Sequence, residues 1–382
     1  MLSCKNYHTN CSVQNGVVAA NPDIAGIGVI ISFLVTTCLA FVLAFVVMSL
    51  ERYNEIDAFV RKYITKKAAV DYSVEPYTWR SHKFWFRILG KNLMAFSDTQ
   101  LLTGMAIQFT ALLEHCEISV YHFKIVTELA FLTTVTHLLA LVALRNYFVE
   151  NKWVNLPRVI FMFTNLGLLA YTSYIAYSYT LVGLRDSSSL ACFYQGHRPH
   201  FKAAFAGRWG ALLVGAIGGH ISVFIAMYFL DDHKAGWWST IRNWVVAPIY
   251  AIYGLVFATI VLRRTQALGT ASVNIDGSEK EWGFGQFLPV LLLALPLLAG
   301  WESFWEENDE VAKGHKHFSL PKIHSGSNPQ EMTNFLSKRP TVEHNSIDNS
   351  ALEATIESHR PSPVTSPDLR PTSSPRCSPR NL

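Results

Sequence analysis

The sequence predicts an all-α membrane protein, a seven-transmembrane helix bundle with its N-terminus outside and a disordered cytosolic C-terminal tail. Three observations predict it. Mean hydropathy is +0.20 over 382 residues. Charged residues make up only 16% of the chain, against roughly 25% in an average soluble domain. The charges are nearly absent from several blocks of about twenty residues, which is the length of helix that crosses a bilayer.

These apolar blocks define the expected spans. They cover residues 25–50, 92–113, 118–144, 156–182, 203–230, 244–262 and 284–304. The second span is the most polar, because it contains Asp98 and Gln100. The last contains Pro289 and Pro296, which predict kinks of a kind that a helix bundle tolerates.

No short apolar core follows a basic N-terminus, so we expect the first span to be an uncleaved anchor. Nearly all tryptophans fall at the ends of the expected spans, where an interfacial position suits their rings.

The distribution of Lys and Arg predicts the orientation of the bundle. The loop between the first two spans carries nine of them, whereas the loop between the second and third carries none. Because basic loops stay cytosolic, residues 1–24 are expected outside and the C-terminus inside. Arg263 and Arg264 would then lie outside, against the rule. Omitting the polar second span would place the basic and the acidic loop on one side, so seven spans are favoured.

Two segments outside the spans have a distinct composition. Residues 77–91, YTWRSHKFWFRILGK, are basic and aromatic, which predicts an amphipathic helix lying on the cytosolic leaflet; an ordinary solvated loop is the alternative. Residues 306–382 are rich in Ser and Pro and contain four Ser-Pro pairs. Such a segment buries too little apolar surface to fold and is expected to be a disordered cytosolic tail. The domain division is therefore 1–24, 25–305 and 306–382.

The cysteines provide a check on this topology that did not enter its derivation. Cys4, Cys11, Cys116 and Cys192 all fall on the expected outer face, where disulfides persist. Four cysteines allow three connectivities, and a Cys116–Cys192 bridge, with Cys4–Cys11 closing a small loop, is the favoured one. Asn10 begins an Asn-Cys-Ser sequon on the same face, which makes it a candidate glycosylation site.

Polar residues inside the expected spans are the candidate functional residues, because burying them in a bilayer is costly. They are Asp98, Gln100, Glu128, His137, Asn165, Arg208 and His220. Nine residues separate Glu128 from His137, so the two point to opposite faces of one helix. A Glu128–Arg208 pair and a His137–Asn165 contact both remain open. The set either holds the helices together by hydrogen bonds or lines a ligand or catalytic cavity.

No motif of soluble enzyme chemistry is present in the sequence. The pairs at His197 and His200 and at Asp231 to His233 do not amount to a zinc ligand set, so no metal and no cofactor is expected. No basic stripe lies on a soluble domain, which argues against nucleic-acid binding.

Four segments together resemble a known family. They are NPDIAGIGVIISF at Asn21–Phe33, SDTQLLTGMAI at Ser97–Ile107, ISVYHFKIVTELAFLTTVTHLLAL at Ile118–Leu141 and WGFGQFLPVLLLALPLL at Trp282–Leu298. The chain from Asn21 to Trp305 resembles a family of fungal integral membrane proteins. Some members are encoded in secondary-metabolite gene clusters and are linked to the biosynthesis of elsinochromes, which are perylenequinone pigments. The resemblance implies an accessory role beside a polyketide pathway and no particular catalytic residues.

Three functions follow as hypotheses. The first is this accessory role, with the lipid bilayer and a small apolar metabolite as partners, in the plasma membrane or an endomembrane. The second is a seven-helix receptor-like protein, although no DRY-like or NPxxY-like string is present. The third is an intramembrane enzyme or small transporter. An enzyme would require Asp98, Glu128, His137 or His220 to converge on one pocket, whereas a transporter often shows an internal repeat, which this sequence lacks.

Overall fold

The computed structural model describes residues 4, 11, 16–66, 78–196, 199–229, 244–245 and 247–317. The chain divides into two units, Met1–Ser319 and Leu320–Leu382, and all described residues lie in the first. Their structure is almost entirely helical. The longer helices are α2 (Ile27–Glu51), α4 (His82–Leu113), α5 (Val120–Ala143), α7 (Lys152–Ser178), α11 (Gly219–Phe229), α13 (Ala247–Leu262), α14 (Phe284–Leu292) and α15 (Ala294–His317).

Short elements connect these helices. They are α1 (Pro22–Ala25), α3 (Tyr53–Val60), η1 (Arg61–Thr65), α6 (Arg145–Glu150), η2 (Tyr179–Val182), α8 (Ala191–Gln195), α9 (Phe201–Phe205), α10 (Arg208–Leu212) and η3 (Leu213–Gly218). The strands β1 (Val18–Ala19) and β2 (Ile275–Asp276) pair in parallel. The sequence offered no signal for strands only two residues long.

Five helical segments are long and apolar enough to cross a membrane. They are Pro22–Glu51, Val120–Ala143, Lys152–Val182, Arg208–Ile225 and Phe284–Ala312. They correspond to five of the seven expected spans and identify a helical membrane protein. The other two expected spans are also helical. Helix α4 is more polar than the five, and α13 is apolar but shorter.

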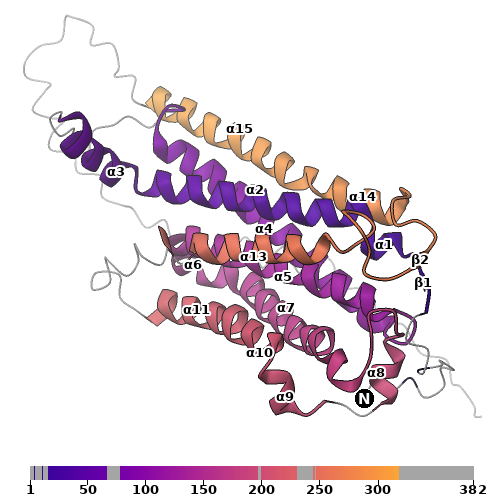
Figure 1. The fold of residues 1–382 in the computed structure, drawn as a ribbon. Helices are drawn as coiled ribbons and strands as arrows, with labels where there is room; N and C mark the ends of the chain where they lie inside the picture. The colour runs from indigo at the N-terminus through magenta and orange to yellow at the C-terminus, as the bar shows by residue number, and fades with distance from the viewer. Residues whose placement is uncertain are drawn as a thin grey trace, which may run out of the picture. The chain divides into compact units, whose positions relative to one another are not determined.

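Helix α5 is the centre of the bundle. Its apolar window is 100% buried, and it packs against α2, α4, α7 and α13. Helices α14 and α15 lie outside this core, where they pack on α2 and α4 respectively. Figure 1 shows the long helices following one common direction. Every side of α5 therefore faces protein, which is why this helix can carry polar side chains at mid-length.

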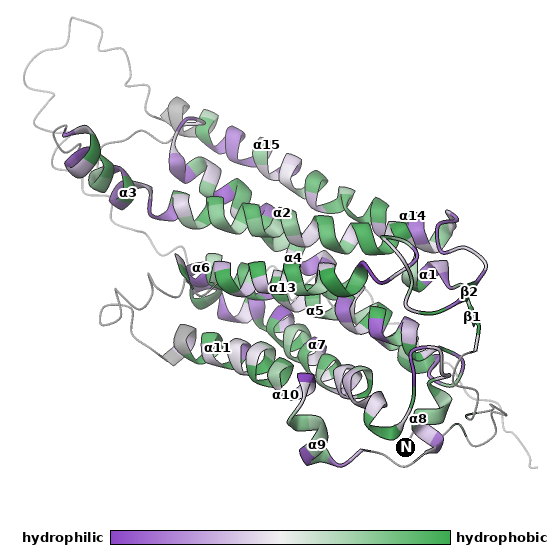
Figure 2. Cartoon of the chain, viewed as in Figure 1, coloured by the Kyte–Doolittle hydropathy of each residue, from purple (hydrophilic) through white to green (hydrophobic). Residues whose placement is uncertain are grey.

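The periphery of the bundle is apolar. Large exposed apolar side chains follow one stripe of α2, namely Ile31, Val35, Leu39 and Val42, and similar stripes lie on α13 and α14. Figure 2 shows this hydrophobic colour along α2 and α13, with hydrophilic residues gathered at α3 and α6. Exposed apolar faces of this extent around a partly polar interior are expected where lipid, not water, surrounds the helices.

Contacts at the helix ends show how the chain runs. At one end β1 pairs with β2, and Tyr121, at the start of α5, donates to Glu279 at 3.0 Å. We call this the outer end. At the opposite, inner end, Asn146 donates to Glu51 at 2.9 Å. Arg87 also donates to Glu307 there, at 2.8 Å. The long helices therefore alternate in direction between the two ends, with α14 and α15 together forming one such path.

Two expected boundaries are wrong. Residues 82–91 do not form a separate interfacial helix, because α4 starts at His82 and continues without a break into the expected second span. The Ser81 hydroxyl caps this start by accepting from Phe84 N at 3.2 Å, and Phe84 and Ile88 are buried. The tail does not begin at Glu306, because α15 continues to His317. Residues 318–382 lie outside the described part of the chain.

The expected distortion of the last span is present as a break at Leu293, between α14 and α15. Pro296 explains it, because a proline has no N–H to donate to the carbonyl of residue 292 and its ring crowds that carbonyl. Pro289 lies within α14. The two prolines were expected to kink the last span, and the structure has one break in it, at Leu293.

We expect Gly104→Val to destabilise the protein by pushing α4 away from α5. A Cβ at Gly104 would overlap Thr133 Oγ1 and lie 2.9 Å from Thr133 Cβ, so the central helix would have to move. Overpacking of this kind costs typically about 1–3 kcal/mol. The thermal unfolding midpoint in detergent would measure it. Gly167→Val in α7 is the matched control, since nothing lies within 4 Å of its Cβ; equal midpoints for the two variants would contradict the prediction.

Candidate functional site

A large cavity opens at the inner end of the bundle, between α2, α4, α7 and α15. Its volume is about 890 Å³. We call it the inner cavity. Apolar residues such as Phe86, Met94 and Leu144 line part of it, and charged or polar residues line the rest, among them Asp98 and Arg158, which form an ion pair. Arg158 Nε donates to both carboxylate oxygens of Asp98, at 2.9 and 2.8 Å. The predicted residue Asp98 is therefore held by a partner from α7 that the sequence did not reveal.

A second cavity, of about 100 Å³, lies towards the outer end between α5, α7, α10 and α13. We call it the outer cavity. The predicted residues Glu128 and Arg208 both line it. Glu128 is 1% exposed, and its Oε1 accepts from the Tyr177 hydroxyl at 2.7 Å. The structure thus brings Glu128 and Arg208 to one cavity, with Tyr177 as the direct partner of the carboxylate.

The remaining predicted residues lie between helices. The hydroxyl of Ser97 and Nδ1 of His137 are 3.2 Å apart, and His220 Nδ1 lies 2.6 Å from the carbonyl of Ala216, four residues earlier in the adjoining η3. Gln108 donates to Asn165 at 2.9 Å, so Asn165 contacts α4 and not His137. Gln100 reaches the Phe33 carbonyl at 3.4 Å. Each of these side chains joins helices or caps its own backbone.

The four titratable candidates therefore do not share a pocket. Asp98 lines the inner cavity and Glu128 the outer one. His137 and His220 are buried, and neither lines the inner or the outer cavity. Glu128 contacts α7 whereas His137 contacts α4, in agreement with their expected placement on opposite faces of α5. The convergence that an intramembrane enzyme would require is not found among the described residues.

The outer end holds polar contacts that the sequence did not predict. Glu279 is fully buried and lies 3.0 Å from His122 Nε2 and 3.0 Å from the Tyr121 hydroxyl. His122 Nδ1 is in turn 2.9 Å from the Ser119 hydroxyl, which caps α5. This network fixes the α13–α14 connection onto α5. His122, a titratable residue inside the expected span 118–144, was a sign of this network in the sequence. Glu279 lies in a loop, where no helical periodicity could mark it as buried.

Lys124 is a further residue that was not predicted, an ionisable side chain one helical turn before Glu128 in the same span. Its Nζ lies 3.1 Å from both carboxylate oxygens of Asp186. Asp186 also accepts from Tyr179, and from Ser272 at 3.0 Å. Burial alone would raise the pKa of Asp186, but the Tyr179 hydrogen bond and the Lys124 ammonium hold it below its usual value.

We expect the contribution of Asp186 to stability to depend on pH. The pKa of Asp186 is lower in the folded protein than in the unfolded chain, where it is about 3.9. Ionised Asp186 therefore stabilises the folded state above about pH 4, and this stabilisation is lost as the pH falls through the folded-state pKa. Asp186→Asn should lower stability at pH 7, by about 1–3 kcal/mol for hydrogen bonds to a charged group. The deficit relative to the unmodified protein should shrink below pH 4. Thermal unfolding midpoints measured from pH 7 to pH 3 test this; a deficit that does not change with pH would refute it.

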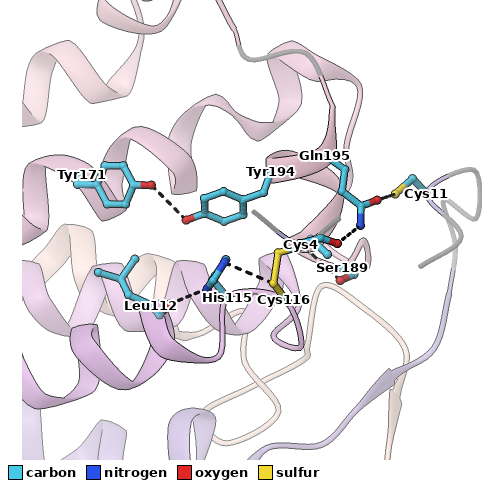
Figure 3. Close-up of a disulfide and its surroundings, with 10 residues drawn as sticks. Cys4, Cys11, Leu112, His115, Cys116, Tyr171, Ser189, Tyr194 and Gln195 are labelled. Carbon is cyan, nitrogen blue, oxygen red and sulfur yellow. Dashed lines mark hydrogen bonds between the residues drawn. A yellow bond between two sulfur atoms is a disulfide. The ribbon is translucent and has the colours of Figure 1, made fainter. Parts of the chain in front are cut away.

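The disulfides differ from the favoured pairing. The structure joins Cys4 to Cys116 and Cys11 to Cys192, so the expected Cys116–Cys192 bridge is wrong. Figure 3 shows Cys4 and Cys116 bonded beside His115, and Gln195 donating to the Cys4 carbonyl at 2.8 Å. Cys4, His115 and Cys116 have ligand atoms close together, but both sulfurs are held in the disulfide. The N-terminal segment, and not a single outer loop, is therefore tied to the bundle.

Other predicted features lie outside the described residues. They are the Asn10 sequon, His197 of the His197/His200 pair, the Asp231 to His233 cluster and the Ser-Pro pairs of the tail.

Comparison with known proteins gives a limited but specific similarity. No family model matches the chain, and no solved structure matches it. The chain is similar to the Elsinochromes biosynthesis cluster protein HP3 of Elsinoe fawcettii, with 32% identity over 114 residues. The aligned region covers 30% of this chain and 42% of that protein, which is less than half of its length. The similarity confirms the resemblance to proteins of such a biosynthetic cluster.

Proposed function

We propose that this chain is a seven-span membrane protein, with its N-terminus outside, that acts as an accessory ligand-binding component of a secondary-metabolite pathway. The inner cavity is the observation that carries the proposal. Its volume of about 890 Å³ falls within the range of roughly 300–1,000 Å³ that is typical of small-molecule sites. Apolar side chains such as Phe86, Met94 and Leu144 line it together with many charged and polar side chains, of which Asp98 and Arg158 are held as an ion pair. Such a lining can bind and orient a ligand that carries polar groups of its own.

The packing of α4 supports its crossing of the membrane despite its polarity. The buried polar residues Ser97, Gln100 and Gln108 all form hydrogen bonds to neighbouring helices. The side chains that α4 exposes include Leu102, Phe109 and Leu113. The mean hydropathy of α4 therefore underestimates how apolar its exposed side is, because the polar residues included in that mean are buried. Helix α13 is 16 residues long, about 24 Å of helix, and Trp244 precedes it at a suitable interfacial position.

The orientation rests on the basic residues of the inner end. Those of the loop between the first two expected spans flank α3 and the start of α4, and the positive-inside rule assigns that side to the cytosol. In a Cys377→Ala background, we expect Asp276→Cys to react with a membrane-impermeant maleimide on intact cells and Asn54→Cys to remain unlabelled. The reverse labelling pattern would overturn the orientation.

A binding role fits the site better than a catalytic one. The four titratable candidates named from the sequence, Asp98, Glu128, His137 and His220, are divided between two cavities and separate helix contacts, so they form no acid–base pair at a common point. The relative is called a biosynthesis cluster protein, and this name supports a role of the present chain in a biosynthetic pathway. A membrane component that binds an intermediate or product would act in such a setting without changing a covalent bond.

Deletion of the gene in its native organism tests the accessory role. We expect the titre of the associated metabolite to fall while transcripts of the pathway genes stay unchanged. An unchanged titre would overturn the accessory role. A fall in those transcripts would favour the alternative, a receptor-like protein that controls the pathway.

Complementation of that deletion tests the inner cavity. Ala95 lines the cavity, so Ala95→Trp should project a large side chain into it and fail to restore the titre. Ala106→Trp, at an exposed position of the same helix, is the matched control and should restore it. Both proteins must be present in the membrane in equal amounts on an immunoblot. Full restoration by Ala95→Trp would exclude the inner cavity as the binding site.

A further inference from the structure

The outer cavity has the features of a second, separate binding site. Glu128 accepts one hydrogen bond through Oε1, from Tyr177 at 2.7 Å, while its Oε2 is buried without a hydrogen-bond partner. An unpaired carboxylate oxygen in a side chain that is only 1% exposed is costly unless something donates to it. Because Glu128 lines the outer cavity, a ligand or water within that cavity is the available donor.

The lining of the outer cavity also contains cationic side chains. Arg208 and Arg264 line it and are exposed. No hydrogen bond or ion pair to another described residue occupies either guanidinium. Lys124 also lines the cavity, but Asp186 already neutralises it. The cavity therefore combines two exposed arginines with a buried hydrogen-bond acceptor. Arginine is well suited to bind a carboxylate through two parallel hydrogen bonds.

Aromatic side chains form the space beside this polar axis. A further cavity of about 90 Å³ is lined by Phe131, Tyr250 and Tyr253. It shares Tyr177, Arg208 and Phe257 with the outer cavity, so the two are adjacent. An engineered apolar cavity of about 150 Å³ is known to bind benzene, which gives the scale of these spaces. Together they suit a molecule with one aromatic ring and are too small for a large polycyclic one.

We propose that the outer cavity binds a small hydroxylated aromatic acid. The ring lies among Tyr177, Phe257 and Tyr253, the carboxylate binds Arg208, and the hydroxyl donates to Oε2 of Glu128. The proposal goes beyond the function proposed above, because it concerns a different cavity, at the other end of the bundle, and a smaller ligand. It also explains why a carboxylate is retained on the most buried helix of the bundle.

The test uses full-length protein in lipid nanodiscs and isothermal titration with three probes. They are 4-hydroxybenzoate, benzoate, which lacks the hydroxyl, and 4-hydroxybenzyl alcohol, which lacks the acid. We expect 4-hydroxybenzoate to bind about tenfold more tightly than either analogue, since a charge-assisted hydrogen bond to Glu128 is lost with benzoate and the arginine contact is lost with the alcohol. Absence of binding at millimolar concentration, or equal affinity for all three, would overturn the proposal.

Variants then assign the two contacts. Arg208→Gln should weaken 4-hydroxybenzoate binding about tenfold, whereas Arg263→Gln, an exposed arginine that does not line the cavity, should leave it unchanged. Glu128→Gln should reduce the preference for 4-hydroxybenzoate over benzoate. If Glu128→Gln does not fold, the probe series and the arginine pair still decide the outcome. Loss of binding in Ala95→Trp would place the probe in the inner cavity and refute the proposal without touching the proposed function.

Discussion

Replacing Glu279 by alanine is expected to cause a large loss of stability. Glu279 is fully buried and accepts from the Tyr121 hydroxyl and His122 Nε2, each at 3.0 Å. Alanine would leave both groups buried without their acceptor. A buried donor left without its acceptor costs about 1–3 kcal/mol, and this substitution leaves two. The thermal unfolding midpoint of the protein in detergent should fall accordingly, and the α13–α14 connection should become accessible to protease.

Two variants distinguish this cause from a general effect of the substitution. Glu281→Ala, two residues further on and exposed, should leave the midpoint nearly unchanged. Glu279→Gln keeps one acceptor oxygen and should lose less stability than Glu279→Ala. If Glu279→Ala and Glu281→Ala unfold at the same temperature, the network around His122 does not stabilise the fold.

Breaking the two disulfides together, with Cys4→Ser and Cys192→Ser, is the second change with a large expected effect. The bridges link cysteines 112 and 181 residues apart in the chain. By chain entropy a bridge across a loop of about 100 residues stabilises by up to about 4.7 kcal/mol, with a usual range of 2–4 kcal/mol. We expect a lower unfolding midpoint and release of the N-terminal segment from the outer end of the bundle. Cys38→Ser, at the free and exposed cysteine, is the control.

Peptide mapping without reductant tests the connectivity directly. Linked peptides should join Cys4 to Cys116 and Cys11 to Cys192. A peptide that joins Cys116 to Cys192 would contradict the structure and restore the pairing favoured from the sequence. That pairing was favoured because Cys116 and Cys192 lie beside spans, which gave both a defined position. The sequence holds no local signal for where the N-terminal segment lies.

The sequence identified several residues of the candidate sites but did not show which of them lie together. The cost of burying charge selects Glu128, Arg208 and Asp98 from the sequence, since each is an ionisable residue in an apolar block. Helical periodicity also predicts that Glu128 and His137 face different neighbours. Periodicity within one helix contains no information on which helix lies opposite. Tyr177 and Arg158, the partners of Glu128 and Asp98, therefore became evident only from the structure.

The sequence by itself determined that this is a helical membrane protein and where its long helices lie, because apolar blocks of bilayer length are a local property of the chain. It also predicted a polar interior, through residues that a bilayer would not accept at its lipid face. Only the tertiary structure decided that α5 is the buried centre, that α4 buries its two glutamines Gln100 and Gln108, that Cys4 pairs with Cys116, and that Glu128 and Asp98 belong to different cavities. These outcomes depend on contacts between residues far apart in the chain, such as Glu279 with His122, and helix propensity and hydropathy act only over neighbouring residues.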